Sequence, residues 1–517
     1  MTGGDWQRIA INGTTMQQAL SEWWSGGEGR SNHTHWHLPC EVTTAAPHQC
    51  NPSCKPVHVQ GGTAPVAGGS GVPDVILWSG AALVARRADR TTPTTVAARK
   101  SLLALADAAM LVVPDPVTNK KMVPPSRDVH DYFSVASYAW PCNVRCNTSL
   151  WSDCSRWCMP PLALRDPGPV CVAANIACDV TSGLPWAMHD GYPRGADQSG
   201  KYLHGDRPRA DAVTVGTTTL VLGWWFQPDP ARAAAYLQRA VLLLRNFFLE
   251  ASTAMNPNMA FAQGTPGRSN GTAYGTADFG RFKMLLDAVR LVESETSTLS
   301  TWTRTDRSAL RRWTSELLGW WTDGCDGCSS LTHNIGDNWD NEAISMALFV
   351  GNHSAAQAIA VRDLRRRVDN QINGSGMLPL EDGRSNSFGY HTGCVLEFFD
   401  MALIGERASA IDLLDYSDPA TGGSVTKALD FLEPICVSNG TLWPFPMVNN
   451  TGESIASMLS RCRLLFTRAS LDNAYPARRE RYLAVAHASG KLSARSDPFL
   501  TLGLTMPDFI ELLYTAD

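Results

Sequence analysis

The sequence predicts an all-α fold arranged as a toroid of antiparallel helix pairs, and three observations lead to this prediction. Segments with apolar residues at helical spacing follow one another through most of the chain, as expected of amphipathic helices. No segment alternates convincingly between apolar and polar residues, so no sheet is expected. The helical segments are too numerous for a small bundle and share no fixed period, which argues against a regular repeat array.

In chain order, the elements begin with an irregular N-terminal extension, residues 1–72, which is rich in Gly and Pro. The helical domain, residues 73–517, starts near the amphipathic stretch VAARKSLLALADAAMLVV. A long polar loop follows and contains a Cys-rich insertion, residues 142–182. Apolar stripes and strong helix formers, separated by Pro, Gly, Asn and Asp, then predict helices at about 208–225, 231–251, 277–294, 305–321, 339–350, 353–372, 388–405, 424–432, 453–467, 475–489 and 499–514.

The composition is that of a globular protein without a nucleic-acid or membrane partner. Of the 517 residues, 44% are hydrophobic and 18% are charged, so the chain can bury a large core. The net charge of −5 gives no reason to expect a nucleic acid or a membrane surface as partner. No apolar run approaches the roughly 20 residues that span a bilayer. The oligomeric state is left open, with a monomer as the expectation.

The cysteines and the glycosylation sequons indicate a secreted protein. The chain has 14 cysteines, and a cluster of them runs from Cys142 to Cys178 in a polar loop. Disulfides are the usual role of such cysteines, and a zinc site is the alternative. Asn-x-Ser/Thr sequons recur along the chain and add to the case for secretion. The stretch MTGGDWQRIAINGTT lacks the features of a signal peptide, so either the leader is not part of this sequence or export takes another route.

Four stretches carry more polar and aromatic residues than a helical scaffold needs. The first, VPPSRDVHDYFSVASYAWP, supplies Tyr138 and Trp140, whose rings suit stacking on sugars; a packed aromatic corner explains them equally well. The second, TAMNPNMAFAQGTPG, supplies Asn256 and Gln263, whose amides both donate and accept hydrogen bonds. A helix C-cap followed by a turn explains Asn256 and Pro257 but not Gln263.

The third stretch, HNIGDNWDNE, places His333, Asn334 and Trp339 just ahead of an apolar helical run. These residues are suited to holding a polar ligand, although a helix N-terminus alone also explains them.

The fourth stretch, LPLEDGRSNSFGYHTG, carries Arg384 ahead of Tyr390 and His391 at the start of a predicted helix. A helix N-terminus and a nearby arginine both favour a phenolate, so both lower the pKa of Tyr390 from its usual value of about 10. A buried tyrosine beside a capped helix is the simpler alternative.

These stretches resemble, in order, the motifs of the alginate-lyase-like family of polysaccharide lyases, and the resemblance runs from about Val75 to Ile404. It implies an (α/α) toroid of about six or seven antiparallel helix hairpins, with the Cys-rich segment inserted between two motifs. It also implies cleavage of an acidic, uronic-acid polysaccharide by β-elimination without a cofactor. The matching family patterns are PPSGDxHDYxSxxPYxWP, MNPNxxYAQxxPG, NNHGTWYDxQxxALALFxGD and RTRSxHYSxxN. A fifth stretch, GLPWAMHDG at Gly183–Gly191, resembles the pattern GLPYxxRDG, which lies between the first two.

The same resemblance implies a role for each candidate residue. Tyr390 acts as base and then as acid, Asn334 binds the substrate carboxylate, and Arg384 holds that carboxylate or favours the Tyr390 phenolate. Since one group makes both proton transfers, C5–H and O4 must lie on the same face of the sugar. This predicts poly-mannuronate or glucuronan, rather than poly-guluronate, as the substrate. The sugar-binding contacts are assigned to Asn256, Gln263, Tyr138, Trp140 and Trp339.

The chain departs from the family pattern at three positions. Ile335 and Gly389 stand where the family has histidines, and Asn386 stands where it has a second arginine. Isoleucine can neither transfer a proton nor donate a hydrogen bond. Either a nearby histidine, His333 or His391, substitutes for the lost group, or the carboxylate is bound without it, or the chemistry is weakened.

Two other functions stay open on the sequence alone. The first is a catalytically impaired relative that binds acidic glycans, which the isoleucine at position 335 motivates. The second is a glycoside hydrolase on a similar toroid, using paired carboxylates such as Asp337, Asp340 or Glu381. No metal is expected, because the histidine-rich stretch NHTHWH lies outside the recognised domain.

Overall fold

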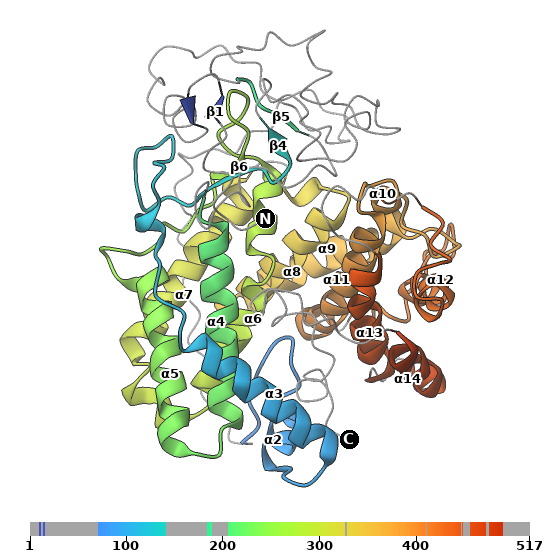
Figure 1. The fold of residues 1–517 in the computed structure, drawn as a ribbon, viewed down its shortest axis with the longest axis horizontal. Coiled ribbons are helices and arrows are strands. Elements are labelled where there is room, and N and C mark those ends of the chain that lie inside the picture. Colours follow the sequence, from blue (N-terminus) through green and yellow to red (C-terminus); the bar gives the residue numbers. More distant parts are fainter. Residues whose placement is uncertain are drawn as a thin grey trace.

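The fold is the all-α toroid that the sequence predicts, seen in a computed structural model (Figure 1). The structure describes residues 10–11, 14–15, 71–140, 184–188, 205–325, 328–409, 411–445, 447, 455–471 and 475–489. Its α-helices are α2 (Gly80–Ala88), α3 (Pro93–Ala109), α4 (Arg207–Phe226), α5 (Pro230–Leu244), α6 (Phe282–Glu293), α7 (Arg304–Gly319), α8 (Asn334–Phe349), α9 (His353–Gln371), α10 (Pro379–Asp382), α11 (Ser387–Ser409), α12 (Val425–Val437), α13 (Ile455–Leu471) and α14 (Arg479–Ala488).

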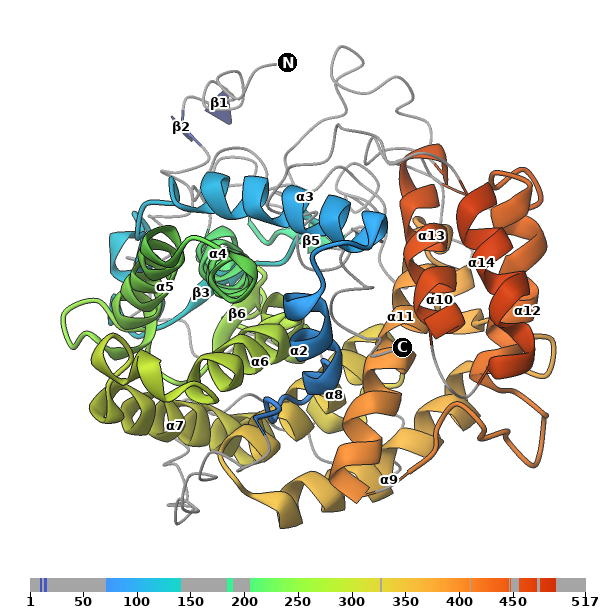
Figure 2. The ribbon, with the colours of Figure 1, turned by 90° about the horizontal axis from the view of Figure 1, so that it is seen from below.

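The long helices form two curved rows. In the inner row α4, α6, α8, α11 and α13 each pack against the next. The outer row covers them: α5 packs on α4, α7 and α9 on α8, and α12 on α11 and α13. Figure 2 shows α5, α7 and α9 on the outside of the curve, with α3 along one edge and α14 at its far end. Two rows of this kind bury the apolar stripe of each helix, which no helix could do alone.

Short helical segments continue or connect these helices. Two π-helical turns extend α5 and α7, and the remaining short segments are 3-10 turns in the connections. The π turns are η5 (Arg245–Leu249) and η8 (Trp320–Gly324), and the 3-10 turns are η2 (Val117–Asn119), η6 (Ala273–Phe279), η7 (Thr296–Ser300), η9 (Cys328–Ser330) and η10 (Pro476–Arg478).

A buried charge cluster joins four helices of the inner row. The Lys283 side chain on α6 is 1% exposed, and its ammonium lies 3.0 Å from Glu397 and 3.4 Å from Asp400, both on α11. Glu342 on α8 lies 3.7 Å from the same nitrogen, and Arg468 on α13 donates to Asp400 at 2.6 Å. Removing one member would leave the others buried without their partner, so the cluster fixes how these helices pack.

Short strands bring distant motifs together at one end of the helical array. The strand β3 (Phe133–Val135) pairs in parallel with β6 (Phe261–Gly264), which joins the first and second motifs. The strand β4 (Ala139–Trp140) pairs antiparallel with β5 (Ala187–Met188), and β1 (Ala10–Ile11) pairs with β2 (Thr14–Thr15). Figure 1 shows β4, β5 and β6 at one end of the molecule, beyond the long helices.

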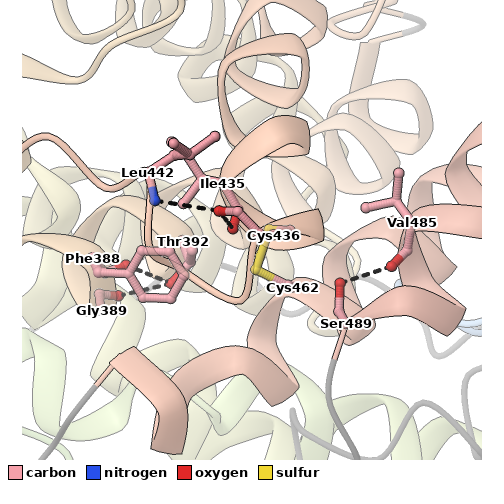
Figure 3. The surroundings of a disulfide bond; sticks show 10 residues. Phe388, Gly389, Thr392, Ile435, Cys436, Leu442, Cys462, Val485 and Ser489 are labelled. Atoms are coloured by element: carbon pink, nitrogen blue, oxygen red, sulfur yellow. Dashed lines mark hydrogen bonds between the residues drawn. A yellow bond between two sulfur atoms is a disulfide. The ribbon is translucent and has the colours of Figure 1, made fainter.

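Two cysteine pairs lie at disulfide distance among the described residues. Cys436 on α12 pairs with Cys462 on α13, and Cys325 pairs with Cys328 just ahead of α8. Figure 3 shows the Cys436–Cys462 bond close to Phe388 and Gly389 in the first turn of α11. The Cys-rich insertion lies outside the described residues, so the pairing expected there stays a prediction, as does the domain boundary at residue 72.

The sequence prediction needs three corrections. The helix expected to start near residue 339 starts at Asn334, because His333 caps it and the polar motif forms its first turns. The helix expected to end near 432 continues to Val437, with Pro434 inside it. Short strands exist where none were expected, since two or three residues are too few to show an alternating pattern. The segment 499–514 lies outside the described residues.

Candidate active site

Two tyrosines from distant parts of the chain meet at the centre of the candidate site. Tyr138 lies just before β4, and Tyr390 lies in the first turn of α11. Their hydroxyl oxygens are 2.8 Å apart, and either can be the donor. Both side chains are half-buried. A phenol within hydrogen-bond distance stabilises a phenolate on its neighbour, so the pair is suited to proton transfer.

Arg384 lies against the ring of Tyr390. Its guanidinium carbon is 3.9 Å from the ring centroid, and its side chain is 24% exposed. The guanidinium also lies 3.7 Å from the carboxylate of Glu381, which is fully buried on α10. A cation in this position favours negative charge on the tyrosine oxygen.

The N-terminus of α8 joins the site through Glu381. The backbone N–H of Asn334 donates to Glu381 Oε1 at 2.8 Å, and the N–H of Ile335 donates to His333 Nδ1 at 3.2 Å. The next N–H, from Gly336, donates to the His333 carbonyl at 2.7 Å. These amides are therefore bonded within the protein, and a substrate carboxylate here has to be met by side chains.

His333 is held as a neutral hydrogen-bond donor. Burial, together with the positive charge of Arg384, lowers the pKa of His333 to about 4. Because Nδ1 accepts from the Ile335 N–H, the imidazole proton lies on Nε2. The ring stacks on Tyr274, with centroids 5.3 Å apart and an interplanar angle of 14°. Nδ1 is also 3.3 Å from the Asn334 amide oxygen; turning that amide over would let its NH2 donate to the same nitrogen.

The other histidine proposed to replace the missing family residue lies elsewhere. His391 is 0% exposed, and its Nδ1 lies 2.7 Å from Asp382 Oδ1. Its ring packs against Phe431 and Trp443. Successive residues on a helix point about 100° apart, so His391 faces the core while Tyr390 faces the site. Of the two candidates, only His333 lies beside Asn334 at the site.

Two of the three departures from the family pattern, Gly389 and Asn386, share one local explanation. A side chain on Gly389 would place Cβ 2.7 Å from the Asn386 amide, so Asn386 occupies the space that a larger residue at 389 would need. At the neighbouring Gly336, which matches the family pattern, a Cβ would lie 2.1 Å from the Leu331 carbonyl oxygen. The backbone N–H of Ile335 donates to His333 Nδ1, which caps α8.

A buried network orients Gln263. Its Nε2 donates to Asp278 Oδ1 at 2.8 Å, and its backbone N–H donates to the Ser134 hydroxyl at 2.8 Å. Burial raises the pKa of Asp278. Arg207 lies 3.6 Å from Asp278 and donates to the Ser137 hydroxyl at 2.7 Å, one residue before Tyr138. With Nε2 directed at Asp278, the Gln263 amide oxygen points away from that carboxylate and is suited to accept from a sugar hydroxyl.

Two predicted sugar contacts have their side chains engaged elsewhere, and the side chain of a third is not described. Asn256 donates to Asp128 at 3.0 Å and to Asp131 at 2.8 Å, which organises its own loop. Trp339 is 2% exposed, and the indole N–H groups of Trp339 and Trp321 each donate at 3.3 Å to the other residue's carbonyl, so Trp339 offers no face to a sugar. Trp140 lies in β4, and only its backbone is described.

The carboxylates considered for hydrolysis are all buried. Asp337 accepts from Gln371 at 2.5 Å, and burial raises the pKa of Asp337 to about 7. Asp340 accepts from Arg367 at 2.6 Å. Asp337, Asp340 and Glu381 are each 0% exposed, so they do not form the pair of accessible acids that glycoside hydrolysis needs.

Several members of the site could not be found from the sequence. Tyr274, Asp278 and Arg207 each act through partners more than ten residues away along the chain, and no local pattern marks them.

Within the described residues, no group of three or more His, Cys, Asp or Glu side chains is placed to hold a metal ion. No described helix is long and apolar enough to cross a membrane.

Fold and site together have the architecture of a polysaccharide lyase: an all-α toroid with tyrosine, arginine, asparagine and histidine side chains gathered near the N-termini of α8 and α11. Comparison with known sequences identifies the family to which this lyase belongs. The sequence model of the alginate lyase family matches residues 116–443, and the protein belongs to that family. The chain is also similar to the crystal structure of an alginate lyase from Bacteroides ovatus, with a TM-score of 0.66 and 24% identity over 84% of this chain and 99% of that one. No curated protein sequence matches significantly.

Proposed function

We propose that this lyase cleaves a 4-linked uronic-acid polymer by syn β-elimination, with Tyr390 as the base and then the acid. The observation that carries the proposal is the surroundings of the Tyr390 side chain. Its hydroxyl is hydrogen-bonded to Tyr138 at 2.8 Å, and its ring lies 3.9 Å from the Arg384 guanidinium carbon. Both neighbours stabilise a phenolate, which is the form that can remove a proton.

The first chemical step is removal of the C5 proton. This proton is very weakly acidic while the adjacent carboxylate is charged, so the site has to stabilise the charge that develops there. Asn334 and the Nε2–H of His333 supply neutral donors for the carboxylate, and Arg384 supplies positive charge. In this assignment His333 takes the place of the histidine that Ile335 replaces, from the preceding position and with a neutral ring at pH 7.

The second step is departure of O4. The proton that Tyr390 removed from C5 is returned to O4, the C4–O4 bond breaks, and a C4–C5 double bond forms. The same hydroxyl can do both only if C5–H and O4 lie on one face of the ring. Mannuronate and glucuronate satisfy this condition and guluronate does not, so the proposed substrates are mannuronate-rich alginate or glucuronan.

The surroundings of the site fit a secreted enzyme that binds a polymer. Gln263 is oriented by Asp278, which leaves its amide oxygen to accept from a sugar hydroxyl, and Tyr138 is partly exposed. The Cys436–Cys462 pair supports an oxidising compartment.

A panel of defined polymers tests the proposal. The purified protein is incubated with mannuronan, glucuronan and guluronan, and the products are followed by ultraviolet absorbance and by a reducing-end assay. The proposal predicts new reducing ends together with absorbance on mannuronan or glucuronan. Reducing ends without absorbance would indicate a hydrolase, retention of the polymer without products would indicate a binding protein, and activity confined to guluronan would contradict the single-tyrosine mechanism.

A further inference from the structure

The short helix α10 carries two adjacent buried carboxylates that face different parts of the molecule. Glu381 is directed at the candidate site, where it accepts from the Asn334 N–H at 2.8 Å and lies 3.7 Å from the Arg384 guanidinium. Asp382 is directed at the core, where it contacts His391 at 2.7 Å and accepts from the Leu378 N–H at 2.8 Å. One residue thus touches two groups of the site, and its neighbour touches none.

We propose that Glu381 is a positioning residue of the elimination reaction, holding Asn334 and Arg384 at a fixed separation on either side of the substrate carboxylate. The inference rests on the proposed function. Asn334 starts α8 and Arg384 lies in the loop before α11, so these two groups belong to different helices of the inner row. Among the described contacts, the Glu381 carboxylate is the group that touches both.

The charge of Glu381 has a second consequence. Its negative charge offsets part of the positive charge of Arg384, which lies on the Tyr390 ring. Polar groups described near Tyr390 include Tyr138 at its hydroxyl and Arg461, which donates to the Gly389 carbonyl at 2.5 Å. Titratable groups described near Glu381 include Asp382 on the same turn and the Cys394 thiol, whose pKa is raised mainly by burial and also by Asp337 and Glu381. His333 lies beside Asn334 and also feels the charge of Arg384. Removing the Glu381 charge therefore leaves Arg384 less compensated and favours the phenolate.

The matched pair Glu381→Gln and Asp382→Asn tests the inference. Each variant removes one buried negative charge from the same turn while keeping the shape of the side chain. For Glu381→Gln we expect kcat to fall about 10- to 100-fold with KM changed less than about threefold, because misplaced groups are felt mainly in the transition state. We also expect the ascending limb of the pH profile of kcat/KM to move to lower pH by roughly 0.5 to 1 unit.

For Asp382→Asn we expect a lower thermal unfolding temperature, and we expect the ascending limb of the pH profile of kcat/KM to stay at its wild-type position. Equal effects of the two variants, or an unchanged kcat in Glu381→Gln, would overturn the inference. If Glu381→Gln does not fold, the variant Glu381→Asp is measured in its place. It keeps the negative charge but has a shorter side chain, so we expect kcat to be at least about tenfold lower and the ascending limb of the pH profile to stay in place. An unchanged kcat in Glu381→Asp would also overturn the inference. If wild-type protein gives no unsaturated product from any polymer, the proposed function fails first and this inference fails with it.

Discussion

Replacing Tyr138 with phenylalanine is a minimal perturbation of the proposed base. The change removes one hydroxyl, which lies 2.8 Å from the Tyr390 hydroxyl, and keeps the ring that a sugar could stack on. Tyr138 is half-buried, so the loss should affect the fold little. If Tyr390 reacts as a phenolate, the variant loses a hydrogen bond to a charged acceptor.

The expected size of the effect follows from that bond. A hydrogen bond to a charged group contributes about 1.5–3 kcal/mol, and partial exposure places this one in the lower half of the range. A loss of about 1.5–2 kcal/mol corresponds to a rise of about 1–1.5 units in the pKa of the reacting tyrosine. Below that pKa, kcat/KM then falls about 10- to 30-fold, and the difference shrinks as the pH rises above it.

The assay is the pH profile of unsaturated-product formation by wild type and Tyr138→Phe. The matched control is Tyr416→Phe, which removes a hydroxyl that donates at 2.8 Å to Asp369, outside the site. We expect the ascending limb to move to higher pH in Tyr138→Phe and to stay in place in the control. A Tyr138→Phe profile that falls by the same factor at every pH, or does not fall, would refute a phenolate stabilised by Tyr138.

The remaining predictions concern His333 and the disulfide between α12 and α13. Because the pKa of His333 is about 4 in the folded protein and near 6.5 unfolded, the unfolded chain binds more protons between these values. Its contribution to stability is therefore lost as pH falls from 6.5 to 4, by up to about 3 kcal/mol. Urea unfolding of His333→Asn should show a flatter pH dependence, and a slope equal to that of the wild type would exclude a neutral His333 ring in the folded protein. Replacing Cys436 and Cys462 by serine removes a cross-link between residues 26 apart in sequence, which should lower the free energy of unfolding by about 3.5 kcal/mol. An unchanged midpoint of urea unfolding would mean that the disulfide does not form.

The fold class was predictable because helical periodicity is local. The apolar stripes fixed most of the long helices within a few residues, and the motif resemblance correctly predicted a toroid. The start of α8 was misplaced because its first turns are polar and are held by the His333 cap rather than by an apolar stripe. The paired strands β3 and β6 were missed because their pairing depends on contacts across more than one hundred residues.

The candidate site was predictable only in part. Tyr390 and Arg384 lie six residues apart, so one motif identified both. The hydroxyl contact between Tyr138 and Tyr390 joins residues 252 apart, and the sequence assigned Tyr138 only a stacking role. Trp339 was assigned to a sugar by its motif, but α8 turns its side chain into the core against Trp321. The contact of Tyr138 depends on a residue far away along the chain, and the position of Trp339 depends on which face of α8 is buried. A single sequence contains neither kind of information directly.

The central claim is that Tyr390 transfers the protons of an elimination reaction. Its most direct test is the initial rate of ultraviolet-absorbing product from mannuronan or glucuronan, whichever the wild type degrades faster, measured for wild type and Tyr390→Phe. The account predicts that the variant folds, still binds the polymer, and loses activity by about 10²- to 10⁴-fold, the usual contribution of a positioned acid–base group. A folded Tyr390→Phe protein that retains wild-type activity would contradict it.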